Sequence, residues 1–176
     1  MSWVDRLMAA VGERPRGLAV DWSAIESRMG TALPSDYKEF CEVFGGGYFS
    51  EFLNVYACAG EADSELVNTY EENWQIAEED ESGRNYYLPH GLFRPKRQAG
   101  LLQWGASIGG DEFAWLADPS VSPDSWPVLA RDDAQYAQRF EMSMSEFVYR
   151  MVADASFGGF GGFGATGEAP YFEPSS

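Results

Sequence analysis

Hydrophobic side chains recur at helical spacing in the first quarter of the chain and predict three short helices. The first covers residues 3–11 and stops at Gly12. The second begins at Asp21, because aspartate favours the N-cap position, and its apolar stripe runs to Met29. The third follows Pro34, since a proline is tolerated in a first helical turn, where its missing N–H costs nothing. Its predicted buried face consists of Leu33, Tyr37, Phe40, Cys41 and Phe44, and glycines 45–47 end it.

A strand and an acidic helix are predicted next. The run "FLNVYAC" (52–58) indicates a strand, and residues 61–81 contain nine acidic side chains and no basic one. Leu66, Tyr70 and Trp74 keep a helical stripe within this segment, so we predict a helix with a negative outer face that frays between 78 and 81. A loop follows with the cations Arg94, Lys96 and Arg97, which we expect to neutralise part of that charge.

Three apolar runs and a closing helix make up the next part of the chain. The runs are "GLLQWGAS" (100–107), "DEFAWLAD" (111–118) and "SWPVLARD" (125–132), and Gly109-Gly110 and two prolines mark the turns between them. This pattern is typical of consecutive antiparallel strands. "SMSEFVYRMV" (143–152) then predicts a helix in which Ser143 and Glu146 form a capping box.

The last twenty residues differ from the rest of the chain. Phe157, Phe160 and Phe163 alternate with paired glycines, which are costly to order. We therefore expect a single domain over residues 1–156 followed by a flexible tail over 157–176. The alternative is that the aromatic side chains of the tail dock on the domain or on a partner.

Composition narrows the possible functions. The chain of 176 residues has a net charge of −16, which speaks against binding to a nucleic-acid backbone and suits a basic partner. Cysteine and histidine are scarce, since the chain has two cysteines, Cys41 and Cys58, and one histidine, His90. These residue types speak against a zinc site, and we expect no cofactor and no metal. No run is long enough to cross a membrane and no basic leader precedes the first helix, so we expect a cytoplasmic protein.

Residues 109–113 spell Gly-Gly-Asp-Glu-Phe, the string by which diguanylate cyclases are recognised. A cyclase would need further carboxylates and a lysine for nucleotide recognition, and the upstream region has no lysine. The simpler interpretation is a glycine turn in which Asp111 and Glu112 form a solvated strand entrance. Phe113 and Trp115 would then face one side of the strand, and Ala114 and Leu116 the other.

The ordered set of motifs resembles the SUKH superfamily. "LPSDYKEFCEVFGGG" is similar to its Leu-Pro helix start and Gly-Gly turn, and "LLQWGASIGGDEFAWLAD", "DSWPVLARD" and "SMSEFVYRMV" follow in the family's order, so that the similarity spans about residues 21–155. The resemblance implies an α+β fold with a mixed, largely antiparallel sheet and helices from both ends of the chain packed on it. It also implies a bacterial immunity protein that binds and blocks a cognate toxin, or a housekeeping interaction module of the same fold.

Stoichiometric binding to a basic, nuclease-type toxin is the function that the residues and the resemblance favour together, with no catalytic residue. Carboxylates would imitate phosphates and meet the lysines and arginines of the toxin, while a few aromatic anchors would supply affinity. The candidate acidic residues are Glu71, Glu72, Glu78, Glu79, Asp80 and Glu81, with Asp111 and Glu112 next, and the candidate anchors are Tyr86 and Tyr87. Each acid could instead be an ordinary solvated helix position.

Overall fold

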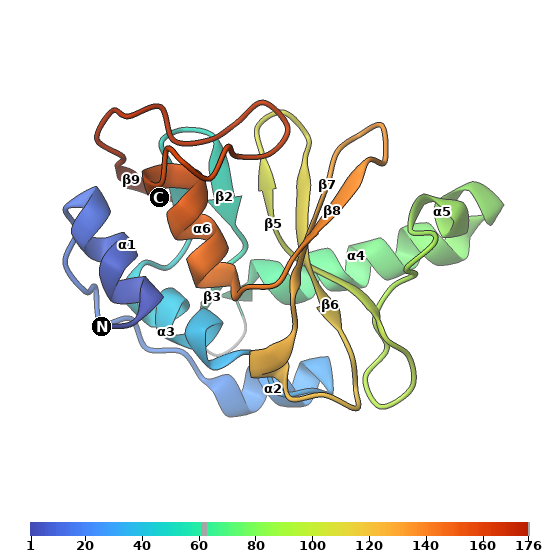
Figure 1. Cartoon of the computed structure of the whole chain (residues 1–176). Coiled ribbons are helices and arrows are strands. Elements are labelled where there is room, and N and C mark those ends of the chain that lie inside the picture. Colours follow the sequence, from blue (N-terminus) through green and yellow to red (C-terminus); the bar gives the residue numbers. More distant parts are fainter. Residues whose placement is uncertain (61–62, 176) are drawn as a thin grey trace.

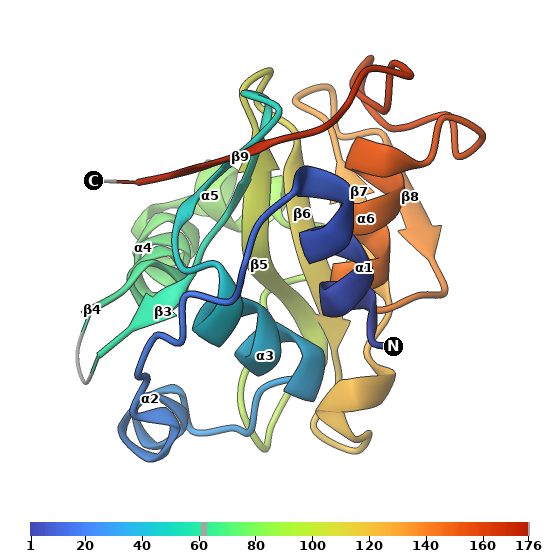
Figure 2. The same ribbon diagram turned by 90° about the vertical axis from the view of Figure 1, so that its left-hand side faces the viewer.

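An antiparallel sheet of seven strands lies between two layers of helices (Figures 1 and 2). The structure is a computed structural model and describes residues 1–60 and 63–175. The helices are α1 (Trp3–Val11), α2 (Trp22–Met29), α3 (Ser35–Val43), α4 (Glu65–Glu79), α5 (Glu81–Tyr86), the 3₁₀ turn η1 (Pro123–Ser125) and α6 (Met144–Ala153). The strands are β1 (Gly47–Phe49), β2 (Leu53–Val55), β3 (Cys58–Ala59), β4 (Asp63–Ser64), β5 (Gly100–Ser107), β6 (Glu112–Ala117), β7 (Val128–Arg131), β8 (Ala137–Phe140) and β9 (Phe172–Pro174).

The three N-terminal helices form where the hydrophobic pattern predicts them. Gly12 ends α1 in the left-handed conformation, and the Asp21 carboxylate caps α2 by accepting the Ala24 N–H at 3.0 Å. Pro34 precedes α3 as its N-cap residue. The five residues of the predicted face of this third helix are all buried: Leu33, Tyr37, Phe40, Cys41 and Phe44.

The order of the main sheet is β8-β7-β6-β5-β2-β1-β9, and every strand pairing in it is antiparallel. β3 and β4 form a separate two-stranded sheet. The fold is therefore α+β, as the family resemblance implies, and the pairings of its main sheet are antiparallel throughout rather than mixed. The strands β5, β6 and β7 lie within the three predicted apolar runs.

The two faces of the sheet carry different side chains. Phe113 and Trp115 point into the large core, where α1, α3 and α6 cover the sheet, as the alternation of β6 predicts. Ala114 and Leu116 point to the other face, which α4 and α5 cover.

Several elements differ from the sequence prediction. The run 52–58 is divided between β2, which pairs with β1 and β5, and β3, which pairs with β4 in the separate two-stranded sheet. The acidic helix does not fray at its end: the Asp80 carboxylate accepts the Gly83 N–H at 2.8 Å and caps a further helix, α5. β8 was not predicted, because three of its four residues are exposed and no apolar alternation marks it.

The C-terminal segment packs on the domain, which differs from the expected flexible tail and agrees with the alternative of docked aromatic side chains. β9 pairs with β1, and the Phe172 ring lies 5.1 Å from Phe44 and 4.8 Å from Phe49 between ring centroids. Phe160 is buried, and Phe163 stacks on Phe52 at 5.4 Å. The segment 157–175 thus belongs to the same folded unit as residues 1–156.

The turn between β5 and β6 explains the two glycines of the Gly-Gly-Asp-Glu-Phe string. Gly110 has a φ of +91°, a conformation that side chains other than glycine rarely adopt. Gly109 lies against the tail: a Cβ atom there would come within 2.6 Å of the Phe163 ring. One glycine therefore makes the turn and the other admits an aromatic side chain of the C-terminal segment.

Both cysteines are buried and unoxidised. The Cys58 backbone N–H donates to the Cys41 sulfur at 3.4 Å, and burial raises the pKa of the Cys41 thiol. They act as small core residues, as the predicted buried face of the third helix indicates for Cys41. Within the described part of the chain, no helix combines the length and the apolar composition that a bilayer crossing requires.

Replacing Phe172 by alanine tests whether the C-terminal strand contributes to the stability of the domain. The ring is 6% exposed, so its removal leaves a cavity beside Phe44 and Phe49, and we expect a loss of about 3 kcal/mol in the free energy of unfolding. Urea denaturation measures this loss. The matched control is Glu173→Ala on the exposed side of the same strand, and equal effects of the two substitutions would contradict the packing of β9.

Candidate partner-binding surface

The helices α4 and α5 form an arm that crosses the outer face of the sheet and projects beyond it (Figure 1). The Ser64 hydroxyl starts α4 by accepting the Val67 N–H at 3.1 Å. Leu66, Val67 and Ala77 are buried against the strands, which leaves the opposite side of α4 facing solvent. We refer to residues 65–86 as the arm.

All six acidic candidates on the arm are exposed, as the sequence predicts for a negative outer face. They are Glu71, Glu72, Glu78, Glu79, Asp80 and Glu81. Glu71 pairs with Arg28 of α2 at 2.9 Å, and Glu78 lies 3.4 Å from Arg94. In the part of the chain that the structure describes, no ion pair joins Glu72, Glu79 or Glu81 to a cation, and of the three predicted cations only Arg94 reaches the arm. The outer face of the arm therefore keeps a net negative charge.

Asp111 and Glu112 do not form a solvated strand entrance, so this expectation was wrong. Asp111 is 5% exposed, and its carboxylate accepts the Ser107 hydroxyl at 2.7 Å inside the β5–β6 turn. Glu112 points to the other face of the sheet and pairs with Arg131. Each carboxylate therefore accepts from an internal donor, Asp111 from Ser107 and Glu112 from Arg131.

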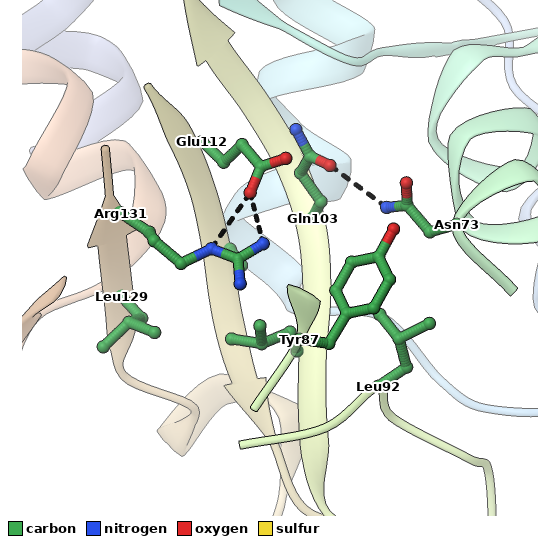
Figure 3. A pocket seen from close by; sticks show the side chains of 9 residues that line it. Asn73, Tyr87, Leu92, Gln103, Glu112, Leu129 and Arg131 are labelled. Atoms are coloured by element: carbon green, nitrogen blue, oxygen red, sulfur yellow. Dashed lines mark hydrogen bonds and ion pairs between the residues drawn. The ribbon is translucent and has the colours of Figure 1, made fainter. Parts of the chain in front are cut away.

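A buried guanidinium joins the arm to the sheet. The Arg131 side chain is 6% exposed and pairs through two N–H groups with Glu112 Oε2, as Figure 3 shows. Its third nitrogen donates to the Tyr86 carbonyl at 2.6 Å, and the guanidinium lies 4.5 Å from the centroid of the Tyr86 ring. The Tyr86 hydroxyl in turn donates to Glu112 Oε1 at 2.9 Å. Three elements, α5, β6 and β7, meet at this cation.

Tyr86 and Tyr87 therefore point inward, where they hold the arm in place. Tyr87 is only 3% exposed, so it is not available as a contact residue in this conformation. Burial, with a contribution from the Glu112 carboxylate, raises the pKa of Tyr87 to about 12. The two rings pack edge to face at 5.0 Å. Sequence reasoning missed Arg131, because a basic residue at the end of an apolar strand gives no sign that it will be buried.

The pocket beneath the arm is too small for a substrate. Asn73, Tyr87, Gln103 and Arg131 are among its walls, and Asn73 Nδ2 donates to Gln103 Oε1 at 3.1 Å (Figure 3). The free space of about 10 Å³ holds about one water molecule. The polar groups of this pocket connect α4 to β5.

The geometry of the turn also bears on the cyclase alternative. Asp111 and Glu112 lie on opposite faces of the sheet, and the Glu112 carboxylate is occupied by Arg131 and Tyr86. Over residues 1–60 and 63–175, no three His, Cys, Asp or Glu side chains are grouped as metal ligands. His90 lies in the loop after α5, and burial lowers its pKa. The glycines and the carboxylates of the string thus each have a structural role in this chain.

Replacing Arg131 by leucine tests the attachment of the arm. Glu112 would remain under the arm without its cation, so we expect a loss of about 3 kcal/mol in the free energy of unfolding and faster hydrogen exchange of the α5 amides. Arg139→Leu is the control, because the Arg139–Glu141 pair is exposed and is expected to contribute less than about 1 kcal/mol. The double variant Arg131→Leu/Glu112→Gln removes the unpaired charge and should recover part of the loss. If the α5 amides of the Arg131→Leu variant exchanged their hydrogens at the same rate as in the wild type, the proposed attachment of the arm would be refuted.

The burial of Asp111 predicts a dependence of stability on pH. Burial raises the pKa of its carboxyl above the ordinary value, and the carboxylates of Asp132 and Asp133 add to this, while the Ser107 hydroxyl opposes it. The Asp111 carboxyl group therefore stays protonated to a higher pH in the folded protein than in the unfolded chain. The stability that this bound proton adds to the folded state is present at low pH and is lost as the pH rises through the pKa of the folded state. Asp111→Asn should gain stability relative to the wild type between about pH 4 and pH 7. Urea denaturation at both pH values measures this, and a constant difference would contradict it.

Comparison with known proteins identifies the family. The sequence model of the SMI1 / KNR4 family (SUKH-1) matches residues 19–137, which is more than half of the chain and includes α2 to β7. Comparisons with curated proteins and with solved structures gave no match. The matched region contains the Leu-Pro helix start, the Gly-Gly turn and the arm. With its α+β architecture and this match, the chain belongs to the SMI1 / KNR4 family (SUKH-1).

Proposed function

We propose that this protein is a bacterial immunity protein that binds a cognate toxin and neutralises it by stoichiometric association in the cytoplasm. The family membership and the exposed acidic face of the arm support this proposal together. Members of the family commonly act as immunity proteins that bind toxins. The protein works by binding, with no covalent chemistry of its own.

The observation that carries the choice of partner is the distribution of charge on the arm. The chain has a net charge of −16, and six exposed carboxylates lie between residues 71 and 81 on one projecting element. A nuclease-type toxin carries lysines and arginines where its phosphate substrate binds, so the arm would occupy the same cations. Electrostatic attraction between a negatively charged surface and a positively charged one raises the association rate constant, up to roughly 10⁸–10⁹ M⁻¹s⁻¹ at low salt.

The rigid attachment of the arm supports this role. Arg131 holds α5 against β6 and β7, so the carboxylates stand on fixed helices and lose little conformational freedom when a partner binds. Ile76 is 46% exposed and Leu88 is 55% exposed on or beside the arm. These apolar side chains are better placed as contact residues than the buried Tyr87.

The test is the association of the protein with the toxin encoded by the neighbouring gene. We expect the double variant Glu78→Lys/Glu79→Lys to associate roughly ten times more slowly at low salt and to show a weaker dependence of the rate on ionic strength, because the attractive field is reduced. Stopped-flow fluorescence at several salt concentrations measures both quantities. Glu13→Lys/Glu168→Lys is the matched control, with the same change in net charge away from the arm.

Two results would contradict the proposal in different ways. Equal rates for the two double variants would remove the arm as the binding surface. Failure of the wild-type protein to protect cells that express the toxin would remove the immunity function and leave a housekeeping interaction module.

A further inference from the structure

The arm covers one half of the outer face of the sheet. It packs over β5, β6 and β7, where Leu101, Ala114 and Leu129 are buried beneath it. On the same face, the strands β9, β1 and β2 carry side chains that solvent reaches. In Figure 2, α1 and α6 lie on the opposite side of the sheet from the arm, so they leave these side chains uncovered. We refer to this half as the open face.

The strand register places the outward side chains of the open face in one row. Glu173 of β9 pairs with Tyr48 of β1, and Tyr48 pairs in turn with Asn54 of β2. Ala106 of β5 is the partner of Asn54. Residues directly opposite each other in adjacent strands point to the same side of a sheet. Tyr48 is 41% exposed, whereas its neighbour Phe49, which points into the core, is 0% exposed.

A groove of about 740 Å³ lies between α4 and the ends of β1 and β9. One face of α4 forms its first wall, since Glu65, Thr69 and Glu72 follow one another at spacings of four and three residues. Gly46 and Ser175, next to β1 and β9 in the chain, belong to the opposite wall. The strands β9, β1 and β2 together are roughly 10 Å wide, which is about the diameter of an α-helix. The open face therefore has room for one helix beside α4.

The open face and its groove are negatively charged. The carboxylates of Glu65, Glu72 and Glu173 are exposed there, and among the described residues Arg16 is the cation that lines the groove. Its guanidinium donates at 2.8 Å to a backbone carbonyl at the end of α3. Burial raises the pKa of Tyr56, the residue after β2, to about 12, and the carboxylates of Glu65 and Glu72 add to this increase. A segment that covers this face would therefore be favoured by positive charge.

We propose that the open face binds a basic α-helix of the toxin, an inference that rests on the proposed function. The helix would lie beside α4 and complete the helical layer on this side of the sheet. Its lysines or arginines would meet Glu72 and Glu173, and Tyr48 would act as the aromatic anchor. The carboxylates of residues 78–81 attract the toxin from a distance, whereas contact on the open face holds it. The two surfaces therefore control different rate constants.

The first experiment measures the dissociation rate constant of the complex with the toxin encoded by the neighbouring gene. Tyr48→Ala should raise this constant at least about tenfold, with a much smaller effect on association. Tyr136→Ala is the matched control, because it removes an exposed tyrosine from the turn between β7 and β8 and should leave dissociation unchanged. Glu72→Gln should also speed dissociation more than Glu13→Gln, which makes the same change in net charge away from the open face. Circular dichroism verifies that each variant is folded.

Photo-crosslinking identifies the segment that covers the open face. With p-benzoylphenylalanine incorporated at position 48, irradiation of the complex should join this position to a helical peptide of the toxin that is rich in lysine or arginine. A crosslink to a second copy of this chain, or to a toxin segment that is not helical or not basic, would overturn the proposal.

The outcomes separate this proposal from the function on which it rests. If the wild-type protein binds the toxin and Tyr48→Ala dissociates at the wild-type rate, the open face is overturned while the immunity function stands. If the wild-type protein does not bind the toxin, both are overturned.

Discussion

The arrangement of the arm depends on one buried cation. Arg131 is placed at the end of β7, where its side chain lies under α5 and cannot reach bulk water. A guanidinium in this position must be paired, and Glu112 on the adjacent strand and the Tyr86 carbonyl at the end of α5 supply the acceptors. Because the two acceptors belong to different elements, satisfying the cation fixes the arm relative to the sheet. The tyrosine rings complete the enclosure, since both lie within 5.5 Å of the guanidinium carbon.

This internal pairing separates two kinds of carboxylate that look alike in the sequence. Glu112 and Asp111 are used within the fold, and their charges are compensated or removed from the solvent. The carboxylates of the arm are exposed, where an ion pair such as Glu71–Arg28 contributes little to stability. Charge that contributes little to the folded state can be selected for association, and this is why the outer face of the arm is the better candidate for a binding surface.

Sequence patterns located the elements whose hydrophobic period is strong. The helices at 3–11, 22–29 and 35–43 and the strands at 100–107 and 112–117 lie within a few residues of the predicted limits, because burial of one face imposes the period on the sequence. The period is lost where pairing is short or exposed, so β1, β8 and β9 were not predicted. The burial of Asp111 and Tyr87 and the internal pairing of Glu112 could not be predicted either, since they depend on the Ser107 hydroxyl, on Arg131 and on the crossing of the arm, which a hydrophobic period does not reveal. The acidic face of α4 was predictable, because it follows from the local period alone.

The C-terminal segment shows how this chain completes the fold beyond the region that the family model matches. An exposed edge strand can pair with another chain, and proteins protect such edges. β8 is one edge of the sheet and carries the charged Arg139 together with other exposed side chains. On the other side β1 would be the edge, with Phe49 beneath it, but β9 pairs with it, inserts Phe172 beside Phe49 and ends at a proline. The glycines between residues 157 and 167 let the chain cross from α6 to this edge. Along this path the Phe160 ring is buried and the Phe163 ring stacks on Phe52. The completed sheet thus has β8 and β9 as its outer strands, and the charged side chain on β8 and the proline at the end of β9 disfavour strand addition at both edges.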